Sequence, residues 1–135
     1  MSQETAVLFA NEAFYVAFAG RDADAMDALW AADAEVTCIH PGWPPLAGRD
    51  AVLRSWREIL ANPESPDVKC RGATARIVGD VAVVLCAEVL AGGQLAATNL
   101  FVREAGGWRM IHHQASPMAG AMAAAAPPET PPTLQ

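Results

Sequence analysis

Three polar side chains in this sequence are suited to proton transfer or to binding a polar ligand group: His40, Asn99 and His112. A neutral imidazole is a general base near neutral pH, and a side-chain amide can donate a hydrogen bond to a developing oxyanion. His40 ends an apolar segment just before a proline. Asn99 interrupts another apolar segment, where a buried amide without a partner would cost about 1–3 kcal/mol. We therefore predict these three residues as candidate catalytic groups; the alternative is that each is hydrogen-bonded inside the fold for structural reasons.

The segment 108–116 is predicted to be the last strand of the domain, and it carries several polar residues. If side chains alternate between the two faces of the strand, one face carries Trp108, Met110, His112, Gln114 and Ser116. That face begins apolar and becomes polar, which is typical of a strand that runs from a core into the mouth of a pocket. We expect Gln114 and Ser116 to bind a ligand at the pocket rim. His113 should point the other way, toward a partner subunit.

Aromatic side chains are expected to supply the apolar lining of this pocket. The candidates come from the first helix, a proline-rich loop, the third helix and a strand: Tyr15, Trp43, Trp56 and Phe101. For Trp56, an ordinary core position is the more common role of such a residue. No metal or cofactor is predicted, because the adjacent His112 and His113 diverge by face and the sequence has no metal-ligand spacing. A Ser-His-Asp triad is not predicted either, because there is no nucleophile-elbow motif.

The elements that must position these residues follow from the periodicity of the sequence. Apolar residues recur with helical spacing in three segments: 3–19, 23–30 and 49–60. Alternating or continuous apolar runs predict five strands: 35–40, 68–78, 81–90, 95–103 and 108–116. Short glycine-containing turns separate the last four strands, so these should form an antiparallel meander. The layout predicts an α+β fold, with the helices packed on one face of a mainly antiparallel sheet.

The segment Val81–Ala87 is apolar on both faces. An antiparallel sheet covered by helices on one side normally shows polar residues to water on the other. The second face therefore needs a cover, and we predict a homodimer through this sheet face. Residues 119–135 are rich in alanine and proline and show no periodic apolar face. We therefore predict one domain over residues 1–118, followed by a disordered tail.

The composition limits the classes of partner and the compartment. The 135-residue chain is 53% hydrophobic and has a formal net charge of −6, with no basic cluster, which argues against nucleic-acid binding. No apolar run is long enough to span a membrane, and the N-terminus lacks the basic region of a signal peptide. Three cysteines without CxxC spacing are typical of free thiols in a reducing compartment. We therefore expect a cytoplasmic protein.

Three short motifs occur in the order and spacing of a known superfamily. The first is Ala28-Leu29-Trp30-Ala31-Ala32-Asp33-Ala34-Glu35-Val36. The second begins with His40-Pro41 and continues with Leu46, Gly48-Arg49 and Ala51-Val52. The third is Trp108-Arg109-Met110-Ile111-His112-His113-Gln114-Ala115-Ser116. Over about residues 5–118, the chain resembles the NTF2-like superfamily, and within it the SnoaL-like and ketosteroid-isomerase-like proteins. The third motif is also similar to the end of the association domain of the calmodulin-dependent kinases.

The resemblance implies a conical fold, in which a curved sheet wraps around the helices, encloses an apolar pocket and dimerises through its outer face. Ketosteroid isomerase uses an aspartate base and an oxyanion hole formed by a tyrosine and a protonated aspartic acid. By resemblance, the base position falls at His40, or at Cys38 in a gap-free register. The tyrosine position falls at Phe14, one residue before Tyr15, and the aspartic acid position at Asn99. Because the chemistry of these positions has changed, the resemblance does not imply steroid isomerase activity.

Two kinds of function are consistent with the sequence. In the first, which it slightly favours, the pocket binds a small, largely apolar organic molecule and catalyses nothing. In the second, the protein is a cofactor-independent isomerase, cyclase or dehydratase acting on a small carbonyl compound. His40 would then remove a proton next to the carbonyl, and Asn99 or His112 would stabilise the oxyanion.

Overall fold

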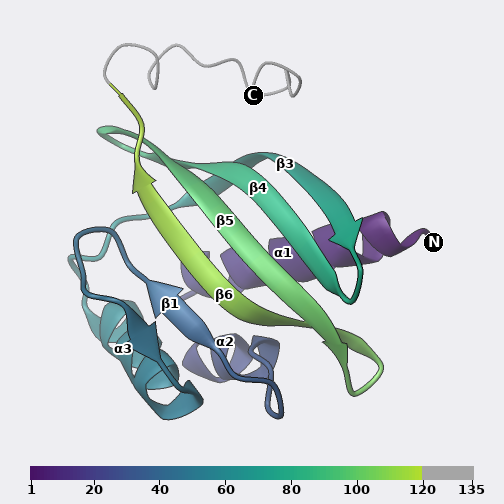
Figure 1. The fold of residues 1–135 in the computed structure, drawn as a ribbon. Helices are drawn as coiled ribbons and strands as arrows, with labels where there is room; N and C mark the ends of the chain where they lie inside the picture. Colours follow the sequence, from purple (N-terminus) through teal and green to yellow (C-terminus); the bar gives the residue numbers. More distant parts are fainter. Residues whose placement is uncertain (120–135) are drawn as a thin grey trace.

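The computed structural model describes residues 1–119, which form three helices and six strands (Figure 1). The helices are α1 (Gln3–Ala19), α2 (Ala23–Leu29) and α3 (Arg49–Ala61). The strands are β1 (Thr37–Ile39), β2 (Leu46–Ala47), β3 (Lys69–Val78), β4 (Val81–Leu90), β5 (Gly93–Glu104) and β6 (Gly107–Pro117). The first strand is shorter than predicted, and β2 has no counterpart among the predicted strands. The predicted tail lies almost entirely outside the described residues.

The six strands form one curved sheet in the order β2-β1-β6-β5-β4-β3. Strands β3 to β6 pair with their chain neighbours in antiparallel fashion, so the predicted meander is confirmed. Strand β1 pairs with β6 in parallel, which leaves the sheet mainly antiparallel. Helix α1 packs against β3, β4 and β6, and α3 packs against β1 and β2. The predicted α+β fold is therefore confirmed. None of the described helices is both long and apolar enough to cross a membrane.

Helix α1 brings polar as well as apolar side chains to the sheet. It begins after Ser2, whose hydroxyl oxygen accepts a hydrogen bond of 3.1 Å from the Thr5 N–H. Its buried face includes Phe14 and also Asn11 and Tyr15, which share that face at helical spacing. Buried polar groups in folded proteins have hydrogen-bond partners. The inner face of the sheet must therefore present polar groups opposite Asn11 and Tyr15.

Strand β6 contains a bulge that changes which side chains face the helices. Phe101 of β5 pairs with Met110 and its neighbour Leu100 pairs with His112, so Ile111 is an extra residue on β6. Before the bulge Met110 is buried, and after it the buried residues are His113 and Ala115. The predicted orientations of His112, Gln114 and Ser116 toward the pocket, and of His113 away from it, are therefore wrong. The prediction assumed unbroken alternation, and one inserted residue moves every later side chain to the opposite face.

The outer face of the sheet is open in the single chain. Along β4 the buried residues, from Ala82 to Glu88, alternate with residues that are half-buried or exposed. Leu85 on that outer face is 44% exposed. The apolar outer face predicted from the sequence is thus present in the structure.

Candidate functional site

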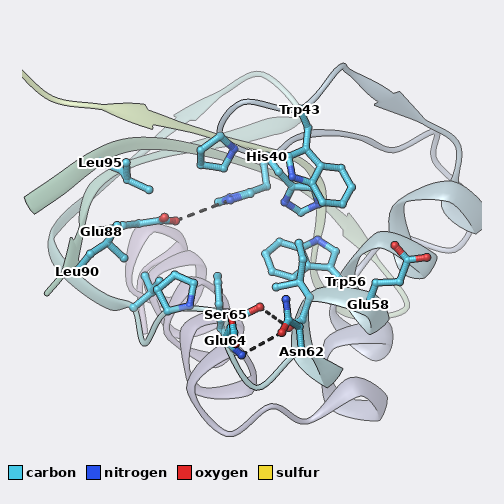
Figure 2. Close-up of a pocket in the computed structure, with 16 residues that line it drawn as sticks. His40, Trp43, Trp56, Glu58, Asn62, Glu64, Ser65, Glu88, Leu90 and Leu95 are labelled. Carbon is cyan, nitrogen blue, oxygen red and sulfur yellow. Dashed lines mark hydrogen bonds and ion pairs between the residues drawn. The ribbon is translucent and has the colours of Figure 1, made fainter. Parts of the chain in front are cut away.

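A cavity of about 460 Å³ opens between the helices and one end of the sheet (Figure 2). Its walls come from the end of α1, the loop after β1, the C-terminal half of α3, the turn that follows α3, and strands β4, β5 and β6. Arg21 fastens that turn, because its guanidinium donates to the carbonyl oxygens of Asn62, at 2.9 Å, and Ser65, at 2.6 Å. Phe18, Trp43 and Trp56 supply aromatic surface to the walls. The cavity falls within the size range of small-molecule sites.

Glu88 is a buried carboxyl residue of the cavity wall, and it is not among the predicted site residues. It lies on β4 and is 2% exposed, yet it lines the cavity. Figure 2 shows its carboxyl group directed into the space opposite Trp43 and Trp56. The Tyr15 hydroxyl donates a hydrogen bond of 2.6 Å to Oε2. Burial raises the pKa of Glu88 above its ordinary value, and the hydrogen bond from Tyr15 offsets only part of this.

His113 is held beside Glu88 in a defined tautomer. Its Nδ1 lies 2.6 Å from Oδ1 of Asn99, and an amide oxygen only accepts hydrogen bonds, so Nδ1 carries the hydrogen. The Asn99 amide nitrogen in turn donates to Oδ1 of Asn11, at 2.8 Å, and to the Tyr15 hydroxyl, at 3.2 Å. The orientation of the Asn99 amide is thus fixed on both sides. In the neutral ring Nε2 therefore carries the lone pair, and it lies 3.8 Å from Oε2 of Glu88.

The surroundings of His113 keep its ring uncharged. The ring packs between Phe14 and Trp56, with centroid distances of 5.0 and 5.6 Å, and the residue is 2% exposed. This burial lowers the pKa of His113 to about 3, and the nearby His40 and His112 act in the same direction. Burial thus acts on both groups: it raises the pKa of the Glu88 carboxyl and keeps the His113 imidazole neutral. A carboxyl group and a neutral imidazole are neighbours on the cavity wall.

His40 lines the cavity from the end of β1, as predicted. The Ser55 hydroxyl donates its hydrogen to the Val52 carbonyl oxygen at 2.7 Å, so Nε2 of His40 must donate to the Ser55 oxygen, 2.9 Å away. Its ring contacts Trp43 and Trp56 at centroid distances of 4.7 and 4.8 Å. Burial lowers the pKa of His40 to about 4, so this ring is also neutral.

The structure brings some of the predicted site residues together and separates others. His40, Trp43 and Trp56 line the cavity. Asn99 and Tyr15 lie behind its wall and orient Glu88 and His113. Phe101 is 1% exposed and packs in the core without lining the cavity.

His112, Gln114 and Ser116 lie outside the cavity. His112 is half-buried on the outer face of the sheet, where its Nδ1 lies 2.7 Å from the Thr37 hydroxyl. Gln114 shares that face, and Ser116 is exposed near the end of β6.

Polar residues of the site and its supporting network that were not predicted from the sequence include Glu88, His113 as a cavity residue, Asn11 and Ser55. A signal for Glu88 was available, since a single carboxylate within the apolar strand 81–90 is as unusual as the amide of Asn99. Within residues 1–119, no group of three or more His, Cys, Asp or Glu side chains is arranged to hold a metal ion.

The fold has helices on one face of a curved, mainly antiparallel sheet. A cavity lies between the two layers and has ionisable side chains on its inner wall. These features define a class of small pocket-bearing α+β domains. The chain belongs to the SnoaL-like family, whose domain model matches residues 7–120. The resemblance to the NTF2-like superfamily is therefore confirmed.

Several solved structures are similar to this chain. One is a provisionally named dehydratase of the NTF2-like family from Streptomyces avermitilis, 37% identical, with a TM-score of 0.78, covering 86% of this chain and 96% of its own. Another, from Thiobacillus denitrificans, is provisionally named a calcium/calmodulin-dependent protein kinase type II association domain. It is 38% identical, with a TM-score of 0.73, over 82% of this chain and 93% of its own.

A curated relative is the F-box protein SKIP8 of Arabidopsis thaliana. It is 30% identical over 115 residues, which make up 84% of this chain. The chain spans about half the length of that relative.

Proposed function

We propose that the cavity binds a small, largely apolar organic molecule and that Glu88 and His113 transfer protons to and from it, in a cofactor-independent dehydration or isomerisation. The observation that carries this proposal is the acid–base pair on the cavity wall. Glu88 and His113 are each 2% exposed, and the partners of Nδ1 and Oε2 fix both groups. His40 is a second neutral polar group on the same wall.

The energetic cost of this arrangement favours a functional role. Removing ionisable groups from water costs several kcal/mol each, and replacing them by packed apolar residues often leaves a fold as stable or more so. Here Asn11, Tyr15 and Asn99 are also buried, and they serve to orient the pair. Perturbed pKa values in a cavity are typical of acid–base catalysts.

A dehydration balances with these two groups alone. Nε2 of His113 removes a proton from the carbon next to a carbonyl, and the neighbouring carbon–oxygen bond to a hydroxyl breaks. The departing oxygen takes the proton of the Glu88 carboxylic acid and leaves as water, while a carbon–carbon double bond forms. Glu88 is then a carboxylate and His113 an imidazolium. Transfer of one proton from Nε2 back to Glu88 restores the starting state.

The relative from Streptomyces avermitilis supports this reading, because it is provisionally named a dehydratase and is 37% identical to this chain. The predicted role of His40 as the base is less well supported than that of His113. Nε2 of His40 donates to Ser55, whereas Nε2 of His113 is a free acceptor beside an acid.

A set of aryl β-hydroxyketones tests the reaction, beginning with 4-hydroxy-4-phenylbutan-2-one, whose dehydration product absorbs in the near ultraviolet. The protein should accelerate product formation over buffer. The Glu88→Gln and His113→Asn variants should each lose about 10²-fold or more, the usual size of a general acid or base contribution. His112→Asn, a change to the adjacent residue on the outer face, is the matched control and should retain the rate. If members of the set bind in the cavity and none reacts faster than in buffer, the catalytic part of the proposal is wrong.

A second proposed property is assembly through the outer face of the sheet. Leu85 is 44% exposed there, among the other apolar side chains of β4. The Thiobacillus denitrificans relative is provisionally named an association domain. We therefore propose a homodimer in which two sheets face each other. The free thiols of Cys38, Cys70 and Cys86 suit a reducing compartment, and we propose a cytoplasmic location.

A further inference from the structure

We infer that the cavity selects against anions, so that its ligand is an organic molecule without a carboxylate, phosphate or sulfate group. This inference rests on the proposed function of the cavity and names the substrate class of that same site. It follows from the charges that line the cavity and from the one carboxyl oxygen that its inner wall leaves open.

Three carboxyl side chains line the cavity, and no positively charged side chain of the described residues lines it with them. The lining includes Glu58, Glu64 and Glu88, and within residues 1–119 it includes no Lys or Arg. Glu58 and Glu64 are exposed and belong to α3 and the turn after it, while Glu88 lies across the cavity from Glu58 (Figure 2). Arg21 is bound to the same turn, but its guanidinium is used by backbone carbonyls and does not line the cavity.

The inner wall gives the second, independent observation. Oε2 of Glu88 accepts the hydrogen bond from Tyr15, whereas Oε1 has no hydrogen-bond partner within the described chain. The side chain is 2% exposed and is directed into the cavity. A carboxyl oxygen that faces the cavity without a protein partner is suited to an uncharged polar group on a ligand, such as a hydroxyl, which can both donate to it and accept from it. A ligand anion placed there would have its charge beside a carboxyl oxygen and two neutral imidazoles.

The anion would find no positively charged side chain elsewhere on the wall that residues 1–119 form. His40 and His113 both have lowered pKa values and are neutral, so neither supplies a positive charge. The remaining surface is largely aromatic and aliphatic, and burying an anion against it costs its hydration energy without return. At the mouth, Glu58 and Glu64 add a repulsion that salt will weaken, because both are exposed. Uncharged ligands meet none of these costs.

Two fluorescent probes with one carbon skeleton test the inference. N-phenyl-1-naphthylamine is uncharged, and 1-anilinonaphthalene-8-sulfonate is the same molecule with a sulfonate. Titrated into the protein at pH 7.5 and low salt, the uncharged probe should bind at least about tenfold more tightly. The Glu58→Gln, Glu64→Gln double variant should improve binding of the anionic probe about threefold to tenfold and leave the uncharged probe unchanged. Added salt should narrow the difference between the probes.

Probe binding must be assigned to the cavity, because the outer sheet face is also apolar. Leu95→Trp fills the cavity that Leu95 lines, and Leu85→Trp makes the same change on the outer face. The first should weaken the uncharged probe at least about tenfold, and the second should not. Crystals soaked with the uncharged probe give an independent location if Leu95→Trp does not fold.

The outcomes separate the two proposals. Equal affinity of both probes for the cavity would overturn the selection against anions and leave the proposed binding function standing. Failure of both probes to enter the cavity would overturn the binding function, and the inference with it.

Discussion

Replacing His113 with asparagine should change how the stability of the protein depends on pH. The amide nitrogen of the introduced side chain occupies the place of Nδ1 and can keep the hydrogen bond to Asn99, so the substitution mainly removes Nε2 and its titration. In the wild type the pKa of His113 is lowered from 6.5 to about 3, because the ring is buried between Phe14 and Trp56. The folded protein therefore excludes a proton that the unfolded chain accepts.

The sign and size of the effect follow from proton linkage. Between pH 6.5 and about 3 the unfolded state binds more protons at this residue, so stability present at neutral pH is lost as the pH falls through that window. A pH of 5.0 lies about 1.5 units below the unfolded pKa. At about 1.36 kcal/mol per unit, the stability lost there is about 2 kcal/mol. The raised pKa of Glu88 acts in the opposite direction, but Glu88 is present in both proteins and its effect largely cancels in their difference.

Urea unfolding at pH 7.5, 6.0 and 5.0, followed by tryptophan fluorescence at constant ionic strength, measures the difference. The stability advantage of wild type over His113→Asn should shrink by about 2 kcal/mol from pH 7.5 to pH 5.0. His112→Asn, on the half-buried neighbour, should show little change of this kind. A wild-type advantage that stays constant with pH, or a His113 resonance that titrates near 6.5, would refute a neutral His113 and with it the role of this ring as the base.

Two further predictions concern the buried network and the outer face. Tyr15→Phe removes the hydroxyl that donates a hydrogen bond to Glu88 and accepts one from Asn99. It should lower the free energy of unfolding by about 1–3 kcal/mol at pH 7. An unchanged urea midpoint would contradict the hydrogen bonds assigned to Tyr15. The wild type should be a dimer in light scattering coupled to gel filtration, and Leu85→Lys should make it a monomer; a wild-type monomer at micromolar concentration would exclude the sheet-face dimer.

The elements of the fold could be predicted because their signals are local. Helical spacing predicts α1 over the residues that form it, and continuous β-forming residues between glycine turns predict β4 over Val81–Leu90. The short β2 has no such signal, since two residues show no period. It is defined by its pairing with β1, which depends on the tertiary fold.

The site could be predicted only in part, because the pairing of strands determines which side chains meet in the cavity. His40 and Trp43 could be predicted, because the end of a strand and a proline-rich loop can be recognised in the sequence. Asn99 was correctly predicted to be buried with partners, but those partners come from α1 and β6 and cannot be read from its own strand. A search for single polar residues within apolar strands would have selected Glu88 together with Asn99.

The bulge at Ile111 explains how one strand serves both the core and the site. Up to Met110, strand β6 packs apolar side chains against the helices, in register with Phe101. The extra residue then places His113 opposite Asn99 on one side and Cys38 on the other. Without the extra residue, His112 rather than His113 would face inward. A single inserted residue therefore determines the tautomer of the candidate base, and with it the proton-transfer chemistry proposed for the cavity. The polarity pattern of the strand alone predicts that the other histidine, His112, faces the cavity.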